Sequence, residues 1–187
     1  MRSEIGDVIA TRTVTDGDHS VLIEVGRPRP AASSGGAACW FWIQGRGLAV
    51  AGGVDTLAAL YSALVEIGAV LDRTNKDGSE FTTVGPADLG FPGQPRHRNA
   101  TIAGADYELG ELLAIRTLTI RESPHTITIG RPVQADDDQF YLCPFRIDGR
   151  HHSAASGLDG VQALLTALRM IGAWLDLPHD WPVSRIT

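Results

Sequence analysis

The chain has 187 residues, of which 43% are hydrophobic and 20% charged, a composition that excludes a disordered protein. Sixteen basic and 22 acidic residues give a net charge of −6, which argues against nucleic acid as a partner. We expect no membrane span, because no apolar run approaches the roughly 20 residues that a spanning helix needs. Acidic residues at the start and two cysteines in all favour a cytoplasmic protein without a disulfide framework.

The first 72 residues predict four strands followed by a helix. Apolar and threonine residues alternate, a polar break or a Gly-Arg-Pro sequence ends each of the first two strands, and a Gln-Gly pair favours a hairpin turn. In the first strand the even positions, Val8 among them, are expected to face the core. A helix then follows, with Asp55 as its N-cap and leucine or isoleucine at helical spacing. The expected elements are strands at 8–15, 21–25, 39–43 and 46–51, then a helix at 55–71.

The same pattern returns 104 residues later. Residues 5–72 and 109–176 share 27 identities over 68 positions without a gap, and we interpret this as a tandem duplication. The predicted fold class is therefore α+β, with two tandem ββββα repeats arranged as an intrachain pseudo-two-fold dimer. The predicted organisation is a first repeat at 1–72, a connection at 73–108 and a second repeat at 109–187. The connection is rich in Gly and Pro, and it is either an ordered crossover or a mobile linker.

Two tryptophans distinguish the first repeat from the second. Trp40 and Trp42 lie on the face of the third strand opposite its core residues, where the second repeat has Pro144 and Arg146. One interpretation is that the connection or the other repeat covers the tryptophans. The other is that they belong to a binding surface, where Trp and Arg are enriched.

Two arginines recur on strand faces that are otherwise apolar. Arg12 and Arg116 each need a partner, because an unpaired buried charge is very unfavourable. We expect structural ion pairs, and the alternative is a pair of anion-binding arginines. The candidate partners are two sets of recurring carboxylates, Asp55 with Asp159 and Asp72 with Asp176.

Familiar catalytic and cofactor-binding motifs are absent from the sequence. It contains no His-Glu-x-x-His, Cys-x-x-Cys, phosphate-binding loop or Gly-x-Ser-x-Gly. Cys39 and Cys143 fall on the expected core face, where cysteine acts as a small hydrophobe. His151 and His152 are adjacent on a strand, so their side chains diverge and cannot hold one metal together. We therefore expect no metal and no cofactor, and we lean towards a protein that is not an enzyme.

The second repeat resembles a known family. The residues that carry the resemblance are Cys-Pro-Phe-Arg-Ile-Asp-Gly at 143–149 and Gly-Leu-Asp-x-x-Gln-Ala-Leu at 157–164. They resemble a family of small bacterial proteins described only as a domain of unknown function, over about residues 111–176. The first repeat matches it more loosely, departing at Trp40, Trp42 and Ala58. The resemblance implies the fold of each repeat but no activity, so no catalytic residue can be transferred from it.

Two functional hypotheses follow. The leading one is a non-catalytic binding module for another protein, such as an immunity or accessory factor, because catalytic motifs are absent and one face carries Trp40 and Trp42. The alternative is a small-molecule-binding protein or enzyme with a site in the groove between the repeats. The candidates for that site are Arg146, Asp148, His151 and His152.

Overall fold

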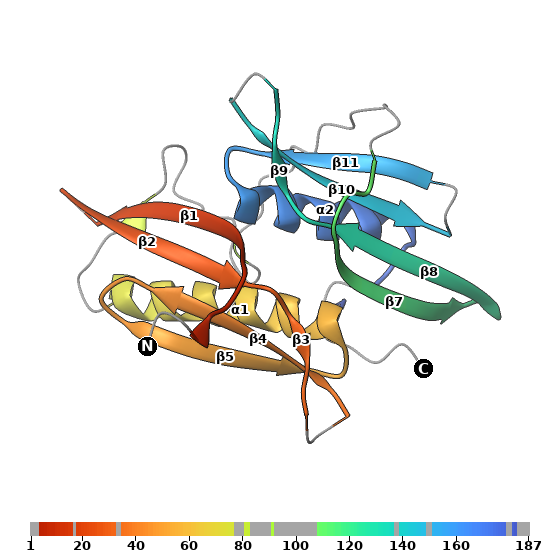
Figure 1. The fold of residues 1–187 in the computed structure, drawn as a ribbon, viewed down its shortest axis with the longest axis horizontal. Helices are drawn as coiled ribbons and strands as arrows, with labels where there is room; N and C mark the ends of the chain where they lie inside the picture. The colour runs from red at the N-terminus through yellow and green to blue at the C-terminus, as the bar shows by residue number, and fades with distance from the viewer. Residues whose placement is uncertain are drawn as a thin grey trace.

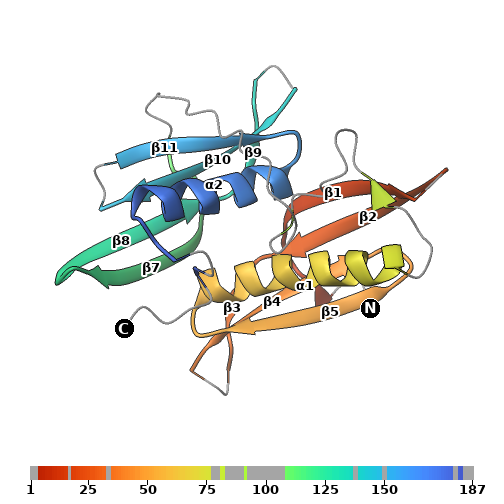
Figure 2. The same cartoon turned by 180° about the vertical axis from the view of Figure 1, so that it is seen from behind.

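The computed structural model describes most of both repeats. The described residues are 4–16, 18–32, 35–76, 81–82, 91, 108–136, 139–148, 151–178 and 181–182. They form two antiparallel sheets, each followed in the chain by one helix, so the predicted α+β class is confirmed. The strands face the viewer in Figure 1, and both helices face the viewer in Figure 2, which shows the molecule from behind. Both helices therefore lie on the same side of the molecule.

Sheet A contains the strands that precede the first helix and one short strand that follows it. Its hydrogen-bonded order is β3-β4-β2-β1-β6, and β5 pairs with β4. The helix α1 packs on β4 and β5. The elements of this first unit are β1 (Val8–Asp16), β2 (His19–Gly26), β3 (Arg29–Pro30), β4 (Ala37–Ile43), β5 (Gly47–Gly53), α1 (Thr56–Lys76) and β6 (Phe81–Thr82).

Sheet B repeats this arrangement in the second unit. Its order is β11-β10-β8-β7, with β9 paired to β10, and α2 packs on β10 and β11. The elements are β7 (Leu112–Ile120), β8 (Ser123–Gly130), β9 (Val133–Gln134), β10 (Tyr141–Ile147), β11 (His151–Gly157) and α2 (Gly160–Trp174). The four long strands of each unit agree with the predicted meander. The two-residue strands β3 and β9 were not predicted, because a dipeptide carries no measurable periodicity.

Each helix covers one face of its sheet with the apolar residues that the spacing predicts. Along β4, buried and half-buried residues alternate, and Cys39, Phe41 and Ile43 are buried on one side. The helix residues Leu57, Leu60, Leu64, Ile67 and Leu71 are all at most 1% exposed. The same holds in α2 for Val161, Leu164, Leu168 and Ile171, each at most 3% exposed. Leu175 was predicted to continue that series but follows the end of the helix and is half-buried.

The expected alternation of the first strand is wrong at its beginning. A register shift between Val8 and Ala10 lets Ile9 and Ala10 both be buried, so Val8 does not face the core as predicted. The second unit has the same irregularity between Leu112 and Ala114, and Leu112 is 44% exposed. A β-bulge places an extra residue in one strand, and strict period-two alternation cannot register it.

Part of the connection between the units belongs to the core. β6 pairs antiparallel with the end of β1, where Thr15 lies opposite Thr82. Phe91 is 1% exposed and belongs to the hydrophobic core. Where it is described, the connection therefore contributes to the packed structure, and the rest of 77–107 lies outside the described residues.

The close approach of each helix to its last strand requires glycine. A Cβ at Gly157 would lie 2.3 Å from the backbone nitrogen of Ala163, and one at Gly53 would lie 2.2 Å from that of Ala59. We expect Gly157→Ala to lower the free energy of unfolding by about 2 kcal/mol, because the helix must move away from the sheet. Gly52→Ala is the control, since its Cβ would meet only one atom, at 4.0 Å. Chemical denaturation measures both, and equal stability of the two variants would contradict the packing argument.

Candidate functional site

The two units are joined by buried arginines that cross from one to the other. Arg12 on β1 donates from Nε to Oδ2 of Asp159 at 2.9 Å and from Nη2 to Oδ1 at 3.1 Å. Arg116 on β7 donates from Nε to Oδ2 of Asp55 at 2.6 Å and from Nη2 to Oδ1 at 3.0 Å. The two arginines are 4% and 8% exposed. Both contacts are thus bidentate and largely withdrawn from water, the geometry in which a guanidinium–carboxylate pair is strongest.

Each of these aspartates also caps a helix. Oδ1 of Asp55 accepts the N–H of Ala58 at 2.8 Å, and Oδ1 of Asp159 accepts the N–H of Gln162 at 2.7 Å. One carboxylate therefore satisfies a free amide of its own helix and neutralises an arginine of the other unit. The N-terminal ends of both helices and the contact between the units therefore depend on the same two side chains, Asp55 and Asp159.

Asp176, one of the other two recurring carboxylates, lies in a different setting. Asp176 lies 3.9 Å from Arg121, and both of these side chains are almost fully exposed. Asp72, the remaining candidate, is half-buried on α1. Of the alternatives left open by the sequence, the structure joins the arginines to the helix-capping pair.

Residues from the segments after each helix lie beside the buried arginines. The guanidinium carbon of Arg12 lies 5.0 Å from the centre of the Phe91 ring. Arg116 donates from Nη1 to the carbonyl oxygen of Pro182 at 2.6 Å, and the neighbouring Trp181 is 4% exposed. Both arginines are therefore enclosed by chain that follows the helix of their own unit.

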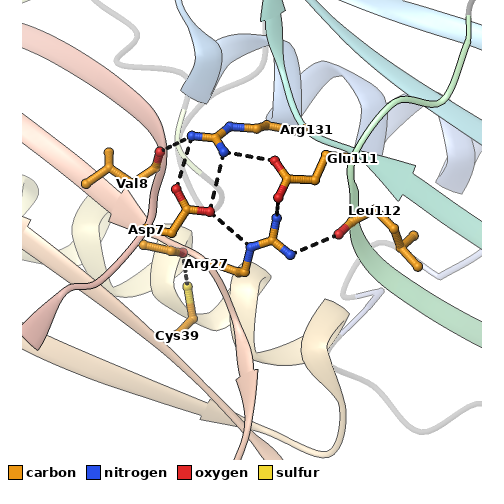
Figure 3. A network of polar contacts seen from close by, with 8 residues as sticks. Asp7, Val8, Arg27, Cys39, Glu111, Leu112 and Arg131 are labelled. Carbon is orange, nitrogen blue, oxygen red and sulfur yellow. Dashed lines mark hydrogen bonds and ion pairs between the residues drawn. The ribbon is translucent and has the colours of Figure 1, made fainter.

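A second junction consists of four charged residues, Asp7, Arg27, Glu111 and Arg131, which we call the charged quartet (Figure 3). Arg27 contacts both carboxylates, Asp7 at 3.1 Å and Glu111. Arg131 also contacts both, Glu111 at 2.9 Å and Asp7 at 3.2 Å. The hydrogen bond to Glu111 raises the pKa of Arg131 above its ordinary value. The four charges cancel, and each acid bridges the two units.

The arginines of the charged quartet also reach across to backbone. Arg131 donates from Nη2 to the carbonyl oxygen of Val8 at 2.7 Å, and Arg27 donates from Nη1 to that of Leu112 at 3.3 Å. Arg131 is the counterpart of Arg27 in the repeat, and Leu112 is the counterpart of Val8, since the residue numbers in each pair differ by 104. The same holds for the two arginine–aspartate pairs, so each of these contacts between the units occurs twice with the roles exchanged.

The sequence pattern did not single out the charged quartet. Its arginines belong to the Gly-Arg-Pro sequences that end β2 and β8, where glycine and proline alone explain the end of a strand. The feature that could have indicated the charged quartet is the recurrence of an arginine in both Gly-Arg-Pro sequences and of an acid at Asp7 and Glu111. Contacts between residues more than 80 positions apart cannot be read from local spacing.

The two tryptophans lie on the outer face of sheet A, away from α1. Trp40 and Trp42 are both half-buried, in alternation with the buried residues of β4. Their cross-strand neighbours on β5 are Val50, which is 44% exposed, and Leu48. On β2 the neighbour of Trp42 is Glu24, only 8% exposed. This outer face therefore combines aromatic and aliphatic surface with one carboxylate.

The equivalent face of sheet B has different chemistry. Arg146 replaces Trp42 and lies opposite His152, while Pro144 replaces Trp40 and lies opposite the buried Ala154. Arg146 is half-buried, and its Nε is buried without a hydrogen-bond partner in the part of the chain that the structure describes. Arg146 and His152 thus lie side by side on the face of sheet B opposite the buried Phe145 and Ile147.

The remaining candidates for a groove site are Asp148 and His151. Asp148 lies after β10 with a positive φ of 56°, accepts the N–H of Thr126 at 2.8 Å and contacts Nδ1 of His125 at 2.7 Å. The backbone of His151 pairs with Ile147, and its side chain lies outside the described residues. Asp148 is therefore occupied in holding the β10–β11 turn against β8. The first unit has an equivalent contact, from the N–H of Leu22 to Gln44 at 3.0 Å.

No metal site or reactive thiol is found in the described residues. They contain no group of three His, Cys, Asp or Glu side chains that could hold a metal ion. Burial raises the pKa of Cys39 to about 12 and also raises that of Cys143. The thiol of Cys39 lies 3.3 Å from the carbonyl oxygen of Gly26. Both cysteines are core residues with little access to the nucleophilic thiolate form.

Comparison with known protein families gives a match over most of the second unit. Residues 114–187 match a family described as Domain of unknown function (DUF6968). No curated protein and no solved structure matches the chain. Among the described helices, none is long and apolar enough to cross a membrane.

Removing the charge of one capping aspartate tests the junction. We expect Asp159→Asn to lower the free energy of unfolding by about 3 kcal/mol, because Arg12 would stay buried without its counter-charge. Asp55→Asn should do the same through Arg116. The control is Asp176→Asn, whose ion pair is exposed and should matter little. Urea denaturation followed by circular dichroism measures all three, and a loss below about 1 kcal/mol for both junction variants would contradict this account.

The buried cysteines predict a pH-dependent loss of stability. Because the pKa of each thiol is raised on folding, the folded state holds protons that the unfolded state releases as the pH exceeds about 9. The free energy of unfolding should therefore fall as the pH rises from 9 towards 12. At neutral pH, iodoacetamide should modify neither cysteine until urea is added, as measured by mass spectrometry. Rapid modification of the native protein would show that the thiols are accessible.

Proposed function

We propose that this chain is a non-catalytic module that binds another protein through the outer face of sheet A. The observation that carries this proposal is the pair of half-buried tryptophans, Trp40 and Trp42, on the side of the sheet away from its helix. Tryptophan is enriched among the residues that dominate binding energy at protein interfaces. Its large ring gives extensive contact with little loss of side-chain entropy.

The surroundings of the tryptophans suit a protein partner. Val50 is 44% exposed beside Trp40, and Leu48 lies beside Trp42, so the apolar surface continues across β4 and β5. Aliphatic and aromatic surface in one patch is typical of the centre of an interface. The net charge of −6 favours a partner with a basic rim around its contact surface. An immunity or accessory factor that caps another protein would have these properties.

We further propose that the two units arose by tandem duplication and form an intrachain pseudo-two-fold dimer. The exchanged contacts of Arg12 with Asp159 and of Arg116 with Asp55 support this, since an isologous interface makes every contact twice. In this arrangement the second unit holds the first rigidly. The outer face of sheet A is then free to specialise for binding.

A site between the units is less well supported by the same contacts. At that junction the charges cancel within the charged quartet and within each arginine–aspartate pair. Arg146 and His152, two of the four candidates for such a site, lie on the outer strand face of sheet B. We therefore place the proposed binding surface on sheet A.

The test replaces the key tryptophan by the residue that the second unit carries at the same place. We expect Trp42→Arg to fold, because Arg146 occupies the equivalent position, and to weaken partner binding by about 30-fold, as for an interface hot spot. Partners are captured with the tagged full chain, identified by mass spectrometry, and their affinities measured by calorimetry.

The matched control is Arg146→Ala, which should leave the affinity unchanged. Thermal unfolding of each variant separates lost binding from lost folding. Unchanged affinity in Trp42→Arg, or capture of no partner at all, would contradict the proposal. A loss of affinity in Arg146→Ala alone would indicate that the binding surface lies on the second unit.

A further inference from the structure

Among the residues that the structure describes, β7 is an edge strand of sheet B. It pairs with β8 on one side, and no other strand in the described part of the chain pairs with it. It is nine residues long, LLAIRTLTI, and lies at the periphery of the second unit in Figure 1. A strand edge of this length presents a row of N–H and C=O groups to a further strand.

The β7–β8 turn identifies which backbone groups face the open side. Arg121 and Glu122 connect the strands with φ of 48° and 67°, the positive values of a two-residue type I′ turn. In such a hairpin Ile120 and Ser123 form a hydrogen-bonded pair, and antiparallel pairs alternate from there. The N–H and C=O groups of Ile115, Thr117 and Thr119 therefore point away from β8.

The position of proline agrees with this assignment. Pro124 lies opposite Thr119, at a pair that makes no hydrogen bonds within the hairpin. Because proline has no N–H, it fits a position of β8 that donates no hydrogen bond to β7.

Within its own nine residues, β7 has no proline and no exposed charge to protect its edge. It contains no proline or lysine, and its only charged residue, Arg116, is buried and paired with Asp55. Ile115 is 51% exposed, and Thr117 and Thr119 are exposed as well. Natural edge strands are commonly blocked by charge, proline or a covering segment, so an open β-branched edge indicates a pairing surface.

The first unit already carries an added strand at the equivalent edge. β6 pairs with Thr15 and Asp16 at the end of β1, and their counterparts in β7 are Thr119 and Ile120. The fold thus accepts an antiparallel strand at this place without rearranging its hairpin.

We propose that β7 pairs antiparallel with β7 of a second copy of this chain, which extends sheet B across a two-fold axis. If the pairing is centred on Thr117, this residue lies opposite Thr117 of the second copy, and Ile115 lies opposite Thr119 of the second copy. The backbone groups of these three residues that point away from β8 then find partners. Threonine–threonine and apolar–threonine pairs are favourable, and no charges meet on the outer face.

The test measures self-association of the full chain by sedimentation velocity from micromolar to millimolar concentration. Ile115→Lys places a charge at the proposed contact and should weaken dimerisation by about tenfold or more. Thr11→Lys is the matched control, because Thr11 is the exposed counterpart of Ile115 on β1. It should leave the dimer unchanged.

A second pair of variants tests the backbone directly. Thr117→Pro removes an outward N–H without removing a β7–β8 hydrogen bond, so it should abolish the dimer while circular dichroism stays native. Thr13→Pro makes the same change on β1 and should leave the dimer intact. A chain that stays monomeric at all concentrations, or a dimer that neither β7 variant weakens, would overturn the proposal. Neither result bears on the tryptophan surface of sheet A.

Discussion

The structure depends on two guanidinium groups held almost without water between the units. An arginine that is less than one-tenth exposed is stable only with a carboxylate in good geometry, and here Arg12 and Arg116 each obtain one from the other unit. Because each carboxylate also caps a helix, the helix, the strand and the partner unit must assemble together. In this arrangement each buried arginine pairs with the capping aspartate of the other unit.

This coupling explains which parts of the two units resemble each other. Arg12, Asp55 and their counterparts recur unchanged, as do the Gly-Arg-Pro sequences that supply the charged quartet. Residues on the outer faces of the sheets take no part in these contacts, and there Trp42 is replaced by Arg146. Physical constraint is concentrated at the junction and in the cores. The outer faces can therefore differ without disturbing the assembly.

Two surfaces carry the proposed interactions. The outer face of sheet A presents Trp40 and Trp42 as side-chain surface, suited to an interface of shape and apolar contact. The edge of β7 presents backbone groups, suited to another strand. The two surfaces lie on different units and have different chemistry, so the proposed partner binding and the proposed self-association are physically separable.

The sequence by itself determined the elements and their amphipathic faces. Helical spacing identified Leu57 to Leu71 as core, and the repeat at an offset of 104 gave the order of strands twice. Local patterns could not show the bulge that buries Ile9 or the burial of Phe91, because neither follows a period. The sequence also left open whether Arg12 pairs with Asp55, Asp72 or their counterparts. Only the tertiary structure decided that Asp159 is the partner, since 147 residues separate the two and only packing of one unit on the other brings them together.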